Sequence, residues 1–65
     1  MQITLNAEPR DIAGATLSSA LTELGFTSAA IATALNGRFV PREAREATTL
    51  KDGDRLEVLA PMQGG

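Results

Sequence analysis

The clearest candidates for chemistry are the two glycines at the end of the sequence, Gly64 and Gly65. Because paired glycines have no Cβ atoms beside the terminal carboxylate, an extended segment ending in them can enter a narrow channel and expose its carbonyl carbon to attack. Residues 60–65 span at most ~20 Å when extended, which is enough to reach another protein's active site. The carboxylate is ionised at neutral pH and needs activation by a partner. The alternative is a terminal segment that merely frays.

Most of the side chains used in covalent and metal chemistry are missing. The sequence contains no Cys and no His, which excludes a disulfide, a thiolate nucleophile, an imidazole base and a zinc cluster. Ser18 and Ser19 have no base to activate them, so we expect them to face solvent on a helix. Asp52 and Asp54 flank Gly53, but a calcium loop needs further ligands, so a turn is predicted there. We therefore expect no catalytic residue and no metal site in the chain.

Length and charge restrict the classes of partner. With 65 residues and a mass of 6.8 kDa, the chain has room for one small hydrophobic core. Six basic and eight acidic residues give a net charge of −2, which argues against binding to nucleic acid. No run approaches the ~20 apolar residues of a membrane span, and the start of the chain lacks the pattern of a signal peptide. A cytoplasmic domain without membrane contact is expected.

The first residues predict a hairpin. Apolar and polar residues alternate over 1–6, which is typical of a strand with one buried face. Residues 6–9 are rich in turn formers and lead into a short, weak second strand at 10–13.

A helix is predicted at 17–24. Thr16 is a suitable N-cap, and the apolar residues that follow recur at helical spacing. Gly25 can end the helix with a positive φ, and Phe26 then lies where it can contact Leu21.

The second half of the chain predicts three strands. A strand at 30–35 is followed by Asn36-Gly37, which is typical of a type I′ hairpin turn, and by a return strand at 38–40. The last strand is predicted at 55–59, with Leu56 and Val58 facing the core. The shorter segments are a charged helical turn at 42–47, an extended piece at 48–50 and a turn at 51–54.

These elements predict an α+β fold of two layers. One helix covers one face of a mixed sheet of four to five strands. The sequence leaves open which strand is central. We expect residues 1–59 to form the globular domain and residues 60–65 to form a flexible C-terminal tail.

Three apolar residues have no obvious place in the core. If Leu56 and Val58 face inward, Leu59 lies on the opposite face of the sheet, and Phe39 joins it there if Val40 points inward. Exposed apolar patches on small proteins often mark interfaces. Phe39, Leu59 and Met62 are therefore candidates for contact with partners, with ordinary packing at a sheet edge as the alternative.

The arginines between residues 38 and 45 are expected to face solvent. Arg38, Arg42 and Arg45 alternate with Glu43 and Glu46, a pattern typical of a solvated surface. One of these arginines could still contact an acidic patch on an activating enzyme.

Several short motifs in a fixed order resemble a known family. They are Met1-Gln2-Ile3, Asn36-Gly37, Val40-Pro41-Arg42-Glu43, Asp52-Gly53-Asp54 and the terminal Gly64-Gly65. Together they resemble the sulfur carrier proteins of thiamin (thiazole) biosynthesis, which have the ubiquitin-like β-grasp fold. The resemblance runs nearly end to end.

The resemblance implies a carrier that is not itself an enzyme. An E1-like adenylyltransferase would use ATP and Mg²⁺ to adenylylate the Gly65 carboxylate, with no cofactor bound to the carrier. A sulfur donor of the desulfurase or rhodanese type would then convert the adenylate to a thiocarboxylate. Thiazole synthase would take the sulfur. The alternatives are the small subunit of molybdopterin synthase, a ubiquitin-like modifier that attaches to lysines, and a binding module without terminal chemistry.

Overall fold

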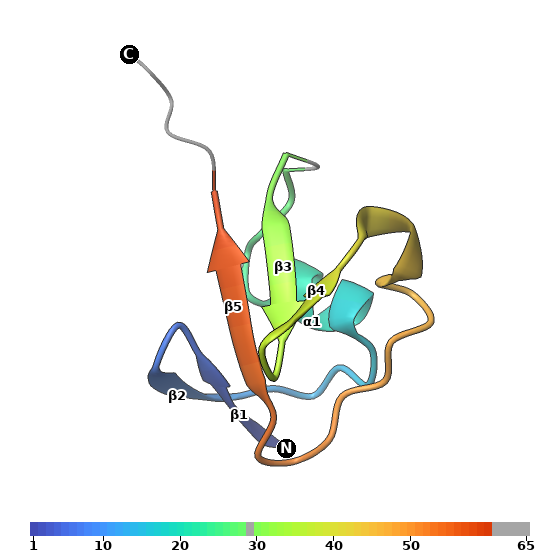
Figure 1. Ribbon diagram of the computed structural model, residues 1–65. Helices are drawn as coiled ribbons and strands as arrows, with labels where there is room; N and C mark the ends of the chain where they lie inside the picture. The colour runs from blue at the N-terminus through green and yellow to red at the C-terminus, as the bar shows by residue number, and fades with distance from the viewer. Residues whose placement is uncertain (29, 61–65) are drawn as a thin grey trace.

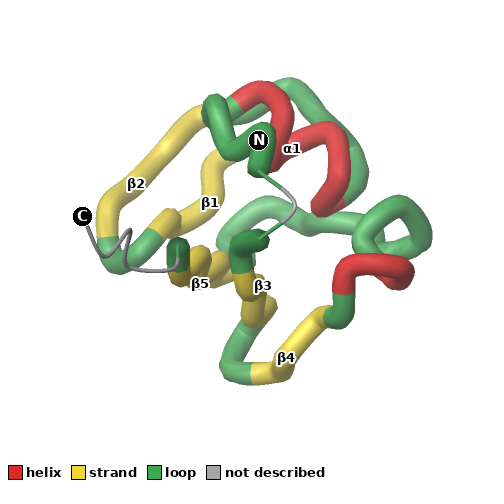
Figure 2. Tube along the Cα trace, turned by 90° about the horizontal axis from the view of Figure 1, so that it is seen from above, coloured by secondary structure: helices red, strands yellow, loops and turns green. Residues whose placement is uncertain are grey.

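A computed structural model describes residues 1–28 and 30–60 (Figure 1). The elements are β1 (Gln2–Leu5), β2 (Glu8–Asp11), α1 (Leu17–Glu23), β3 (Ala32–Leu35), β4 (Arg38–Val40), a 3₁₀ helix (Arg42–Ala44) and β5 (Arg55–Leu59). The strands form one sheet in the order β2-β1-β5-β3-β4. Figure 2 shows this sheet as a curved layer with α1 on one side. The expected α+β arrangement of a mixed sheet and one covering helix, the β-grasp fold, is confirmed.

The last strand in the sequence is the central strand of the sheet. β5 pairs in parallel with β1, where Leu5 lies opposite Leu56, and antiparallel with β3, where Ala32 lies opposite Leu59. Both neighbours are themselves paired in hairpins, β1 with β2 and β3 with β4. The sheet is therefore two hairpins joined by β5, a position that the sequence did not settle.

Both hairpins use two-residue turns. Asn36 and Gly37 have positive φ values of 52° and 84°, as expected for a type I′ turn. The first hairpin differs from the prediction, because its turn consists of Asn6 and Ala7 alone, with φ values of 48° and 72°. Strand β2 consequently begins at Glu8 and ends at Asp11 instead of covering residues 10–13, and it includes Pro9. A proline is tolerated there because β2 is an edge strand.

The helix forms as predicted, one residue shorter. Thr16 caps its N-terminus, and Thr16 and Ser19 form a reciprocal capping box. At the C-terminal end, Gly25 has a φ of 92°, and the N–H of Phe26 donates to the carbonyl of Leu21 at 2.8 Å. This is the hydrogen bond of a Schellman motif, which requires the left-handed backbone that glycine adopts at little cost.

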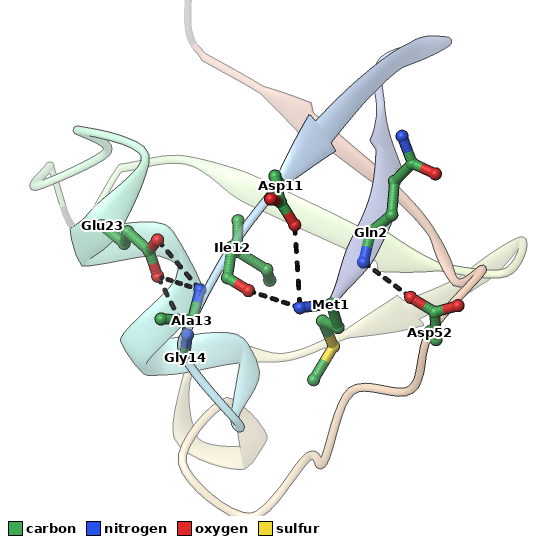
Figure 3. Close-up of polar contacts among 8 residues, drawn as sticks. All are labelled: Met1, Gln2, Asp11, Ile12, Ala13, Gly14, Glu23 and Asp52. Atoms are coloured by element: carbon green, nitrogen blue, oxygen red, sulfur yellow. Dashed lines mark hydrogen bonds and ion pairs between the residues drawn. The ribbon is translucent and has the colours of Figure 1, made fainter.

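The loop between β2 and α1 is held by the helix itself (Figure 3). The carboxylate of Glu23 accepts hydrogen bonds from the N–H groups of Ala13 and Gly14 at 2.9–3.0 Å. A Cβ at Gly14 would lie 2.7 Å from the Ser19 hydroxyl oxygen, so this close approach requires glycine. The N–H of Ile12 also donates to the carbonyl of Met1 at 2.8 Å, which extends the first hairpin up to the loop.

Eleven apolar residues form the core between the sheet and α1. They are Ile3, Leu5, Ile12, Leu17, Ala20, Leu21, Ile31, Val40, Leu50, Leu56 and Val58. Leu56 and Val58 face inward as predicted.

None of the helices within residues 1–28 and 30–60 has the length and apolar character needed to cross a bilayer.

Arg45 corrects the expectation of a fully solvated arginine surface. Arg38 and Arg42 are exposed, but Arg45 keeps only 8% of its surface accessible. Its Nη2 donates to the Ile31 carbonyl at 2.7 Å, and its Nε donates to the Thr33 hydroxyl at 3.3 Å. The arginine thus joins the segment after the 3₁₀ helix to β3.

Asp54 is the second buried charged residue and links two turns. Its carboxylate accepts hydrogen bonds from the Asn36 side chain at 3.0 Å and from the Lys51 N–H at 2.8 Å. The Asn36 hydrogen bond, together with the N–H and the charge of Lys51, holds the pKa of Asp54 below its usual value, although burial acts in the opposite direction.

The lowered pKa of Asp54 predicts a loss of stability in acid. Because the folded state favours the charged carboxylate, its contribution is complete above the pKa of an unfolded Asp, about 3.9, and is lost as the pH falls through the lower folded-state pKa. Urea unfolding between neutral pH and acid should show this loss in the wild type. In Asp54→Asn the decline should be smaller, and parallel pH profiles of the two proteins would contradict the assignment.

Candidate functional site

The candidate site begins where β5 ends. Leu59 is the last residue of the central strand, and Ala60 beyond it is exposed. The chain therefore leaves the sheet between two strands that are already paired. Gly64 and Gly65 and the proposed partner contact Met62 lie outside the described residues, as does the predicted tail apart from Ala60. Their roles stay predictions.

Two asparagine side chains hold β5 near its two ends. Asn36, in the β3–β4 turn, accepts the N–H of Arg55 through its side-chain oxygen at 2.9 Å and donates its own backbone N–H to the Arg55 carbonyl at 2.7 Å. Asn6, in the β1–β2 turn, accepts the N–H of Val58 at 2.9 Å and donates to the Val58 carbonyl at 3.3 Å. Asn6 thus continues the pairing of β1 with β5 beyond Leu5, toward the end from which the chain leaves.

The face of the sheet opposite α1 carries two exposed apolar side chains that the sequence identified as candidates for contact with partners. Phe39 and Leu59 are 70% and 73% exposed. Between them the small side chains of Ala32 and Ala34 leave a hollow of about 200 Å³, which Glu57 also lines. The register explains the grouping, because Ala34 lies opposite both Phe39 and Glu57, and Ala32 lies opposite Leu59. Contact of Phe39 and Leu59 with a partner stays a prediction.

The acidic residues of the 51–54 segment serve the fold. Asp52 accepts the N–H of Gln2 at 2.6 Å (Figure 3). Asp54 accepts the hydrogen bonds from Asn36 and Lys51 described above. Gly53 between them has a φ of 90°, as a turn requires. Within the part of the chain that the structure describes, no three His, Cys, Asp or Glu side chains gather in a way that could hold a metal ion.

The sequence did not reveal the asparagine contacts or the buried Arg45. The Asn36-Gly37 pair identified a turn, but not the strand that the asparagine side chain would contact. For Asn6, the only signal was a turn-forming residue after a strand. Arg45 resembled its exposed neighbours because nothing in the sequence of the 42–47 segment showed which of its residues packs against β3.

Comparison with known families and curated proteins gives a consistent result. The model of the ThiS family matches residues 3–65. The sulfur carrier protein ThiS of Thermus thermophilus is 42% identical over 64 residues, which are 97% of this chain and 98% of that protein. A thiazole synthase of Paramagnetospirillum magneticum is 35% identical over 66 residues. These cover all of this chain but only 20% of the synthase, so the similarity concerns about one fifth of its length.

Solved structures show the same fold. The crystal structure of the thiamine biosynthesis protein ThiS from Geobacter metallireducens has a TM-score of 0.83 and 39% identity, with both chains fully covered. The solution structure of a thiamine biosynthesis protein from the same organism has the same score and identity, and 88% of its chain is covered.

The contact between Asn6 and β5 predicts a local loss of stability in Asn6→Gly. Glycine keeps the positive φ but removes both hydrogen bonds to Val58, so unfolding should become easier by about 1–2 kcal/mol. Amide exchange at Val58 should also accelerate. Ala7→Gly is the matched control, because it places glycine at the neighbouring positive φ without removing a side-chain hydrogen bond. Unchanged exchange at Val58 in Asn6→Gly would show that the contact does not hold the strand.

Proposed function

The chain belongs to the ThiS family of sulfur carrier proteins, which act in thiamin biosynthesis, and we propose that it carries sulfur as a thiocarboxylate on Gly65. The observation that carries this proposal is the family match, which extends through Gly65. The position of β5 supports it, because the segment that ends at Gly65 starts from the central strand of the sheet. A rigid base lets a partner bind the globular domain and the terminal segment together.

The first step of the proposed cycle activates the carboxylate. An E1-like adenylyltransferase binds ATP and Mg²⁺, a carboxylate oxygen of Gly65 attacks the α-phosphorus, and pyrophosphate leaves. The product is an acyl-adenylate, in which AMP is a far better leaving group than oxide. The catalytic groups, the nucleotide and the metal belong to the partner, and the carrier contributes the reacting carboxylate.

The second step replaces oxygen by sulfur. The terminal sulfur of a persulfide on a desulfurase or rhodanese type of donor attacks the carbonyl carbon, the bond to the AMP oxygen breaks, and an acyl disulfide forms. A second thiol then attacks the donor's sulfur in this disulfide, which releases the thiocarboxylate and leaves the donor sulfur in a new disulfide with that thiol. We place this cycle in the cytoplasm.

Thiazole synthase is the proposed acceptor of the sulfur. The support is the similarity between this whole chain and one fifth of a thiazole synthase, which indicates that a carrier of this kind and the synthase can share one polypeptide. Transfer would leave the Gly65 carboxylate ready for another cycle.

The open face of the sheet is the proposed docking surface for the adenylyltransferase. Phe39 and Leu59 project from it beside the hollow over Ala32 and Ala34. Leu59 is one residue from the terminal segment, so a partner that contacts it is also close to the start of that segment. The match to the ThiS family favours a sulfur carrier of thiamin biosynthesis over a molybdopterin synthase subunit.

Variants at the C-terminus test the reacting group. One additional residue after Gly65 moves the carboxylate by ~3.5 Å and replaces the reacting carboxylate with an amide, so pyrophosphate release by the adenylyltransferase should cease. Gly65→Ala retains the carboxylate but adds a Cβ beside it, so it should react more slowly with a nearly unchanged KM. Pyrophosphate release measured against carrier concentration separates the two effects. Wild-type rates for the extended chain would exclude Gly65 as the reacting residue.

A substitution on the open face tests the docking surface. Leu59→Ser should raise the KM of the adenylyltransferase for the carrier about tenfold, which corresponds to about 1.4 kcal/mol of binding free energy. The maximal rate should stay the same, because the terminal chemistry is intact. Ala47→Ser, at an exposed position near the 3₁₀ helix, is the control and should leave the KM unchanged. An equal KM for Leu59→Ser and the control would contradict the proposed surface.

A further inference from the structure

A second hollow lies on the helix side of the molecule, away from the open face of the sheet. It has a volume of about 360 Å³ and lies between α1, the loop before β3 and the segment that contains the 3₁₀ helix. Unlike the hollow beside Phe39, it is lined mainly by polar groups. Its hydroxyl-bearing and charged lining residues include Ser18, Thr22, Ser28, Arg42, Arg45 and Glu46.

The guanidinium of Arg45 uses only one of its edges within the fold. Nε and one N–H of Nη2 lie on the same edge of the planar group, and these two donors contact Thr33 and Ile31 on β3. The end-on edge, formed by Nη1 and the second N–H of Nη2, has no hydrogen-bond acceptor among residues 1–28 and 30–60. Every fully buried side-chain nitrogen or oxygen in those residues has a partner, so Nη1, which has none, is accessible to solvent. We infer that this nitrogen reaches solvent within the cleft that Arg45 lines.

The charge of Arg45 is also unpaired within the described part of the chain. No carboxylate there lies within 4 Å of its guanidinium, although the residue is more than nine-tenths buried. A buried cation without an anion is costly, and an oxyanion that meets two parallel N–H donors forms a strong bidentate pair. The free edge of Arg45 therefore has the geometry of an oxyanion receptor.

The other charged groups of the cleft indicate which oxyanion fits. Arg42 adds a second positive charge, and Glu46 adds a negative one, so the cleft has a single net positive charge. This balance suits a singly charged carboxylate better than a doubly charged phosphate, which Glu46 would repel. The hydroxyl of Ser28 accepts an N–H from Ala30 and keeps its own hydrogen available as a donor.

The cleft lies near the end of the sheet from which the C-terminal segment leaves. The loop that lines it leads into β3, whose first residue, Ala32, pairs with Leu59 at the end of β5. Figure 1 shows the loop before β3 and the tip of β5 at the same end of the molecule. A protein that binds the C-terminal segment would therefore have this cleft within its contact range.

We propose that this cleft receives an acidic side chain of the protein that activates the C-terminus, through a bidentate pair between its carboxylate and Arg45 that Arg42 reinforces. The identity of the partner rests on the proposed function, whereas the carboxylate-binding cleft rests on the geometry of Arg45 and the charges of Arg42 and Glu46. This contact lies on the helix side, so it is separate from the docking surface at Phe39 and Leu59.

The first experiment tests the cleft without any partner. Acetate is added to ¹⁵N-labelled protein at constant ionic strength, with acetamide, chloride and phosphate as comparison probes, and the signals of the Arg45 Nε–H and the Ser18 and Ser28 amides are followed by NMR. Acetate alone should cause saturable shifts. Glu46→Gln should tighten acetate binding, and Arg42→Gln should weaken it, by roughly two- to fivefold each.

Three results of this titration would overturn the proposal. The absence of saturable shifts with acetate would mean that the cleft binds no carboxylate. Shifts of the same size with chloride or acetamide would mean that the cleft does not recognise a carboxylate. Tighter binding of phosphate than of acetate would mean that the wrong oxyanion has been assigned. Every variant retains Arg45 and its hydrogen bonds within the fold, so a change in acetate binding is not caused by the loss of this structural link.

The second experiment tests the partner by reversing charge at matched positions. Arg42→Glu changes the cleft, whereas Arg38→Glu makes the same change at an exposed arginine outside it. The KM of the adenylyltransferase for the carrier should rise about tenfold with Arg42→Glu and change little with Arg38→Glu, at equal maximal rates. Equal effects would indicate general charge attraction and overturn the partner assignment. If the wild type itself is not adenylylated, the proposed function fails. The acetate titration still decides whether the cleft binds a carboxylate.

Discussion

The fold depends on the hydrogen bonds that place β5 between the two hairpins. Its pairing with β1 covers only Thr4 and Leu5, and the turn residues Asn6 and Asn36 extend its support by contacts to Val58 and Arg55. Both asparagines adopt a positive φ, which asparagine tolerates better than most residues and which lets their side chains reach the neighbouring strand. The last strand is thereby held on both sides, and the chain leaves the sheet from its centre.

Two buried charged residues connect segments that are distant from each other in the sequence. Arg45 links the region after the 3₁₀ helix to β3, and Asp54 links the 51–54 turn to Asn36. One edge of the Arg45 guanidinium donates hydrogen bonds to β3 and its neighbour Ile31, and the other edge remains available to the cleft. The same residue thus provides both a structural link and the proposed contact with a partner, on the side of the molecule opposite Phe39 and Leu59.

The sequence predicted the elements whose signals are local. The helix followed from Thr16, its apolar spacing and Gly25, and the second hairpin followed from Asn36-Gly37, because a cap or a turn is set by a few adjacent residues. The central place of β5 depends on pairing with residues about 50 positions earlier, for which no local pattern exists. The two-residue turn at Asn6 was missed because Ala7 rarely adopts a positive φ. The inward face of β5 was predicted correctly, and this identified Leu59 as exposed, whereas the burial of Arg45 depends on contacts across the fold.

The central claim is that Gly65 carries sulfur while the rest of the chain holds and presents it. The most direct measurement is the intact mass of the carrier purified from its own cells, compared with carrier treated with the adenylyltransferase, ATP and a sulfur donor, followed by fragmentation to locate the change. The account predicts replacement of one oxygen by one sulfur at the C-terminal residue. Adducts in which Gly65 is joined to lysines of other proteins, with no sulfur-containing form, would contradict it and indicate a protein modifier instead.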